Sequence, residues 1–104
     1  MLLWITPFLP AAPEVPQWLR ADVEGDKVVL RWTPNGEPWF YSYDVVRLSS
    51  GYDSVLVSPK PLRASMWIDL PPPGTYRYQL CAISASSVRS GIASETIVVG
   101  PLPR

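Results

Sequence analysis

Short runs in which apolar and polar residues alternate, separated by turn residues, constrain this chain more than any other feature. Residues 28–32 and 76–82 show the pattern best, because every second side chain there is apolar or aromatic. Successive side chains of a strand point to opposite faces, so each run buries one face. About seven such runs follow one another, and none is a helix-length segment with a 3.6-residue period. The pattern predicts an all-β fold, a seven-stranded antiparallel sandwich of two sheets.

Proline-rich stretches divide the 104 residues into three parts. We expect an extended proline-rich, apolar arm over residues 1–16, the sandwich over residues 17–100 and a short tail over residues 101–104. A body of this size has room for one core only. The expected strands cover residues 17–22, 28–32, 39–45, 55–57, 66–70, 76–82 and 95–99.

The arm combines stiffness with apolar side chains. Pro7, Pro10, Pro13 and Pro16 recur every third residue, which is the period of the extended polyproline II helix. Burial of a large apolar side chain is worth about 1.5 to 3 kcal/mol. We therefore expect the arm to bind a protein partner or another copy of the chain, rather than to be a leader or to line its own domain. The residues expected to make this contact are Leu2, Leu3, Trp4, Ile5, Phe8 and Leu9.

Charge argues against nucleic acid and membranes as partners. Nine basic residues balance nine acidic ones without a run of either sign, whereas nucleic-acid binders carry a basic stripe. The apolar start lacks a basic region, is interrupted by prolines and is too short to cross a bilayer. We expect no membrane insertion and no signal peptide, and a location in a virus particle or on an extracellular surface.

Catalytic chemistry is not expected either. The chain has no histidine, and its one cysteine, Cys81, alternates with predicted core residues and should face outward. No catalytic residue, cofactor or metal is therefore predicted. Asp22, Glu24 and Asp26 have a spacing that calcium ligands can use, but we interpret them as a solvated turn.

Four segments resemble a fibronectin type III domain over about residues 13–99. They are a proline-bearing lead at residues 13–19, VVLRWTP, YSYDVVR and LPPPGTYRYQLCAIS. The resemblance implies a tyrosine corner, in which the Tyr76 hydroxyl binds backbone just upstream. It also implies a spacer, adhesion or recognition role, although fold alone names no partner. The predicted core residues are Trp32, Tyr43, Val45, Leu70, Tyr76, Tyr78 and Leu80.

Loop aromatics provide a second candidate surface. Alternation places Trp39, Tyr41, Tyr43 and Val45 on one face and Phe40 on the other, so one of these aromatic sets can be exposed. Trp39, Phe40 and Arg89 are the candidate recognition residues. The inward or outward orientation of Trp67 stays open, with the inward one favoured.

Taken together, these features predict a non-enzymatic structural or interaction subunit that docks into a larger assembly through its arm. The chain begins with Met1 and ends just past the last predicted strand, so we expect a complete small product. An accessory protein of a virus particle, in capsid decoration or a tail, fits this expectation. The alternative is a recognition or adhesion module that binds carbohydrate or a cell-surface protein through loop aromatics.

Overall fold

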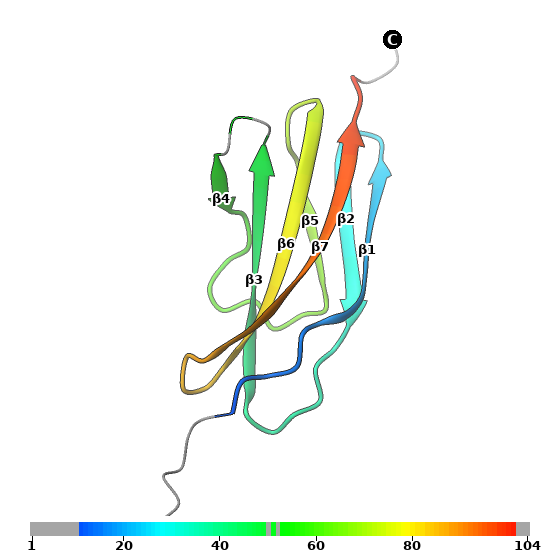
Figure 1. Ribbon diagram of the computed structural model, residues 1–104. Coiled ribbons are helices and arrows are strands. Elements are labelled where there is room, and N and C mark those ends of the chain that lie inside the picture. The colour runs from blue at the N-terminus through cyan, green and yellow to red at the C-terminus, as the bar shows by residue number, and fades with distance from the viewer. Residues whose placement is uncertain (1–10, 50, 52, 102–104) are drawn as a thin grey trace, which may run out of the picture.

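The computed structural model describes residues 11–49, 51 and 53–101, and within them it confirms the predicted sandwich. One sheet has the order β1-β2-β5 and the other has the order β4-β3-β6-β7, with antiparallel pairing throughout. In Figure 1 the four-stranded sheet lies in front of β2 and β5. The strands are β1 (Gln17–Glu24), β2 (Lys27–Thr33), β3 (Phe40–Ser49), β4 (Ser54–Leu56), β5 (Met66–Asp69), β6 (Gly74–Ser84) and β7 (Arg89–Val99).

The core lies between the two sheets, on the inward faces of β2, β3 and β6. The Trp32 ring meets Tyr43 edge-on, with 5.0 Å between the ring centroids. This geometry is a favoured one for aromatic pairs. Trp67 also packs against this core, which settles its orientation as inward. Of the residues predicted to form the core, Trp32, Tyr43, Val45, Tyr76, Tyr78 and Leu80 are buried.

Leu70 was predicted in the core, and this prediction is wrong, because its side chain is 63% exposed. Trp67 packs inward and Asp69 is partly buried. Side chains alternate along an extended chain, so Leu70 falls on the outward side together with Met66 and Ile68. The three prolines that follow, residues 71–73, carry the chain away into the next strand.

A β-bulge corrects the prediction that Trp39, Tyr41, Tyr43 and Val45 share one face. The register between β3 and β6 shifts between Phe40 and Ser42. The extra residue reverses the alternation, so Phe40 packs against the core with its ring centroid 4.6 Å from that of Tyr43. Tyr41 is exposed instead, with the Arg63 guanidinium 5.5 Å from its ring centroid.

A polar network joins the two sheets at one place in the core. Asp69 of β5 accepts two hydrogen bonds at Oδ2, from Arg47 Nη1 of β3 at 2.7 Å and from the Tyr78 hydroxyl of β6 at 2.6 Å. Burial raises the pKa of Tyr78, and the Asp69 carboxylate raises that pKa further. Burial lowers the pKa of Arg47, but the bond to Asp69 more than offsets this and leaves the pKa raised. Arg47 and Tyr78 therefore both hold their protons firmly as donors to Asp69.

The predicted tyrosine corner is confirmed. The Tyr76 hydroxyl donates a hydrogen bond to the Pro72 carbonyl oxygen at 2.6 Å. We expect Tyr76→Phe to lower the free energy of unfolding by about 1 to 2 kcal/mol, because it leaves that carbonyl without its partner. Urea unfolding measures this effect, with Tyr41→Phe, a change at an exposed ring, as the control. Equal urea midpoints for Tyr76→Phe and the wild type would show that the Tyr76 hydroxyl does not stabilise the fold.

Candidate docking site at the root of the N-terminal arm

The residues predicted to dock on a partner, Leu2, Leu3, Trp4, Ile5, Phe8 and Leu9, lie outside the described residues. The described part of the arm, residues 11–16, lies against the body of the domain. Pro13 and Pro16 are buried there. The candidate site is therefore the place where the arm joins the body.

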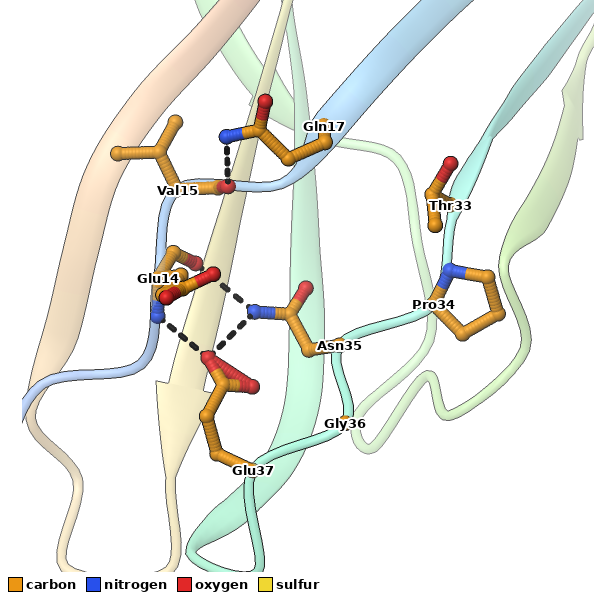
Figure 2. Close-up of a pocket in the computed structure, with 8 residues that line it drawn as sticks. All are labelled: Glu14, Val15, Gln17, Thr33, Pro34, Asn35, Gly36 and Glu37. Atoms are coloured by element: carbon orange, nitrogen blue, oxygen red, sulfur yellow. Dashed lines mark hydrogen bonds between the residues drawn. The ribbon is translucent and has the colours of Figure 1, made fainter.

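Glu14 is held by both of its backbone polar groups. Its N–H donates to Glu37 Oε1 at 2.6 Å, and its carbonyl oxygen accepts from Asn35 Nδ2 at 2.8 Å. Asn35 Nδ2 also donates to Glu37 Oε1 at 3.1 Å, so the two loop side chains support each other (Figure 2). The Trp39 indole N–H donates to the Ala12 carbonyl oxygen at 3.4 Å. We call this set of residues, Ala12, Glu14, Asn35, Glu37 and Trp39, the arm clamp.

The clamp is connected to the core through Tyr43. The Tyr43 hydroxyl accepts from the Asn35 backbone N–H at 2.7 Å and donates to Asn35 Oδ1 at 3.0 Å. Tyr43 itself is 1% exposed, and burial raises its pKa. One bond fixes the backbone of Asn35 and the other orients its side chain, so the arm root is tied to the rigid part of the fold.

A shallow hollow of about 370 Å³ lies beside the clamp, and its lining includes Glu14, Val15 and Glu37 (Figure 2). On another side, Val15 approaches β7 closely at Gly91. A Cβ atom built on Gly91 would lie 2.8 Å from Val15 Cγ2, which is closer than such atoms pack. Glycine at this position therefore allows β7 to lie beside the chain that enters β1 (Figure 1).

Glu37 makes the clamp sensitive to acid. Burial would raise the pKa of Glu37, but hydrogen bonds from the backbone N–H groups of Glu14 and Glu37 and from Asn35 lower it below its ordinary value of 4.5. A carboxylate with a lowered pKa in the folded state contributes stability that is complete above its unfolded pKa. That contribution is lost as the pH falls through the folded pKa.

We therefore expect Glu37→Gln to lower the free energy of unfolding by about 1 kcal/mol at neutral pH. The difference from the wild type should shrink as the pH falls below 4.5, where the wild type loses the same charge. Urea unfolding at a series of pH values measures this difference in unfolding free energy. Glu95→Gln, which changes an exposed carboxylate, is the control. A difference that stays constant from neutral pH to strong acid would contradict the assigned role of the charge.

The structure does not bring the predicted recognition residues Trp39, Phe40 and Arg89 together as a binding surface. Trp39 is 44% exposed, but its indole N–H belongs to the clamp. Phe40 packs against the core. The Arg89 guanidinium donates to Asp44 Oδ2 at 3.0 Å, and this bond raises the pKa of Arg89. Arg89 therefore neutralises a buried carboxylate on the outer face of the four-stranded sheet.

Cys81 lies on the same outer face, as its alternation predicts, but it is covered and only 6% exposed. Its Sγ donates to the Ser90 carbonyl oxygen at 3.4 Å. In the predicted acidic turn, Asp22 and Glu24 form exposed ion pairs with Arg31 at 3.8 and 3.7 Å. Within the described ranges, no group of three or more possible metal ligands is close enough to hold an ion. The part of the chain that the structure describes has no helix with the length and apolar character needed to cross a membrane.

Sequence reasoning missed Glu14, Asn35 and Glu37, which lie in segments interpreted as arm and loop. It also missed Trp18, which is 82% exposed and has a φ of 60°. A bulge between Gln17 and Arg20 turns Leu19 into the core and leaves Trp18 outside. The left-handed region costs a residue with a Cβ atom about 1 to 2 kcal/mol.

No protein-family model and no curated protein sequence matches the chain. Solved structures do match by fold. A fibronectin type III-like protein from Clostridium thermocellum is 25% identical with a TM-score of 0.65, over 90% of this chain and 100% of that one. A human fibronectin type III domain is 17% identical with a TM-score of 0.65, and the match covers 89% of this chain and 77% of that one. The spore cortex lytic enzyme SleM of Clostridium perfringens is 18% identical with a TM-score of 0.66, and the match covers 83% of this chain and 28% of the enzyme.

The chain thus spans 100% and 77% of the two fibronectin type III structures, but only 28% of the lytic enzyme. The strand order, the tyrosine corner and these matches agree. The chain has a fibronectin type III-like fold, a β-sandwich typical of interaction and structural modules.

Proposed function

We propose that this protein is a non-enzymatic interaction or structural module that joins a larger assembly through its N-terminal arm. The observation that carries the proposal is the arm clamp. It holds the backbone of Glu14 as both donor and acceptor. A backbone that is already fixed at residues 12–14 reduces the entropy lost when the residues before it bind a partner.

Among the described residues, the core is built from residues of the body. The buried cluster and the apolar residues packed on it run from Leu19 to Val99. They occupy the inward faces of both sheets. The sequence places large apolar residues from Leu2 to Leu9, and each would contribute about 1.5 to 3 kcal/mol if a partner buried it.

A non-enzymatic role is consistent with the side chains present. The only thiol, Cys81, is buried against Ser90, and the chain has no histidine to act as its base. The cysteine–histidine pairing that activates many catalytic thiols is therefore not available to Cys81. The assembly that we propose is one built from many protein copies, of which a virus particle is the instance expected from the sequence.

Sedimentation through a density gradient tests the proposal, using the assembly isolated from the source of the gene. We expect the full-length chain to travel with the assembly. The chain lacking residues 1–10, which keeps the clamp, should stay at the top of the gradient. The double variant Trp4→Ala, Phe8→Ala should lose most binding, because aromatic anchors dominate interfaces. Ile92→Ala, a change at an exposed residue of β7, is the matched control. Equal binding by the full-length and shortened chains would overturn the proposal.

Exposed aromatics favour one rival, a carbohydrate-recognition module. Trp39 and Tyr41 are each 44% exposed, and aromatic faces stack on sugars. One structure of similar fold is a spore cortex lytic enzyme, in which the matching part is a minority of the chain. A glycan array with the wild type and Tyr41→Ala separates the two functions, since Tyr41 lies outside the clamp. Saturable sugar binding that Tyr41→Ala abolishes would favour the rival.

A further inference from the structure

An apolar hollow of about 420 Å³ lies beside β5. Met66 and Ile68 are 44% and 42% exposed there, and Leu70, just beyond the strand, is 63% exposed. None of the lining residues is charged. They are Leu62, Ala64, Met66, Trp67 and Ile68.

The hollow lies at an edge of the sandwich. β5 is the last strand of its sheet and pairs with β2 alone among the described strands. Exposed edges are usually protected by charged side chains or proline, and residues 66–68 have neither. The charged side chains close to β5 in the sequence have other partners. Asp69 accepts a hydrogen bond from Arg47, and the Arg63 guanidinium lies over the Tyr41 ring. An unprotected apolar edge with a hollow beside it suits an extended apolar peptide that adds to the sheet.

We propose that the β5 hollow binds residues 2–9 of a second copy of this chain. This inference rests on the proposed function and names its partner. Residues 1–10 lie outside the described residues, and residues 1–13 contain no charged side chain. An uncharged apolar segment and an uncharged apolar hollow are complementary. Proline has no N–H to donate to a β-ladder. Residues 2–5 contain no proline, so they can pair with β5 as a strand.

The clamp and the prolines direct the arm to another copy rather than back to its own body. The clamp fixes the backbone at Ala12 and Glu14. The sequence has proline at positions 7, 10 and 13, and we expect such a segment to extend away from the clamp rather than turn back, because proline restricts φ and favours an extended chain. An arm of one copy on the β5 of the next is a head-to-tail contact, which closes into a ring or continues as a filament.

Sedimentation velocity on purified protein tests this inference. We expect the full-length chain to associate as its concentration rises, and both the chain lacking residues 1–10 and Ile68→Glu to remain monomers. Ile92→Glu, which places the same charge on the exposed face of β7, should associate like the wild type. The shortened chain and Ile68→Glu should form a one-to-one complex when mixed, because one supplies the hollow and the other the arm. Urea unfolding verifies that each variant is folded.

Three results would overturn the inference. The first is association that requires residues 1–10 but survives Ile68→Glu, which leaves the proposed function intact with another site. The second is a wild type that stays monomeric at every concentration. The proposed function would then be tested only by the density-gradient experiment with the isolated assembly. The third is failure of the shortened chain and Ile68→Glu to form a mixed complex although the wild type associates.

Discussion

Trp32→Ala is expected to lower the free energy of unfolding by about 3 to 5 kcal/mol, the usual loss for a large aromatic removed from a core. Trp32 is 6% exposed and packs edge-on against Tyr43. Truncation leaves a cavity between the sheets and also removes support from the residue that orients Asn35. Small domains have about 5 to 15 kcal/mol of stability in total, so the variant should be close to unfolding at physiological temperature.

Trp18→Ala provides the matched control, because it makes the same chemical change at a side chain that is 82% exposed. We expect this variant to unfold within about 0.5 kcal/mol of the wild type, as surface substitutions usually do. Urea unfolding followed by circular dichroism measures both. A loss of similar size in the two variants would mean that Trp32 is not a core residue.

Asp69→Ala is expected to lower the free energy of unfolding by about 3 kcal/mol, because it breaks a charge pair that is mostly buried. The side chains of Arg47 and Asp69 are 20% and 11% exposed. Without the carboxylate, the guanidinium has no counter-charge and the Tyr78 hydroxyl has no acceptor. Both groups would stay shielded from water with their hydrogen bonds unmade, which is the costly situation.

Asp22→Ala is the control for this change, since Asp22 forms exposed ion pairs with Arg20 and Arg31 at 3.7 and 3.8 Å. Exposed pairs contribute at most about 1 kcal/mol. A double-mutant cycle of Asp69→Ala with Tyr78→Phe should also give a coupling energy above about 0.5 kcal/mol. Additive losses in that cycle, or equal losses for Asp69→Ala and Asp22→Ala, would contradict the network.

Alternation predicted the fold because every strand of a sandwich has one buried face. Alternation failed to place individual side chains where a β-bulge inserts an extra residue into a strand. The bulges at Phe40/Ser42 and Gln17/Arg20 each reverse the face of the next side chain. No turn residue marks either place in the sequence, so Tyr41 and Trp18 could not be assigned from the pattern.

The start of the last strand shows a different limit. β7 begins at Arg89 rather than at residue 95, because the serine-rich segment makes a tight turn. The Ser84 Oγ accepts from the backbone N–H groups of Ser86 and Val88, and Ser87 adopts a φ of 66°. Serine favours such turns as much as it favours loops, so composition alone does not separate the two.

The clamp could not be predicted, because it joins residues far apart in the sequence. Glu14 and Glu37 are separated by 23 positions. The sequence between Pro34 and Pro38 indicates a loop, but nothing in it identifies the backbone of Glu14 as the partner. The interpretation of residues 1–16 as a separate arm came from prolines alone, whereas residues 12–14 bind the body.

Hydrogen–deuterium exchange tests most directly whether the arm serves another molecule rather than its own domain. The measurement compares the full-length chain with the chain lacking residues 1–10 at low and high protein concentration. We predict the same protection of β2, β3 and β6 in both chains, and protection of residues 2–9 that appears only as the full-length concentration rises. Protection of residues 2–9 at every concentration, together with faster exchange of β2 and β6 in the shortened chain, would show instead that the arm belongs to its own core.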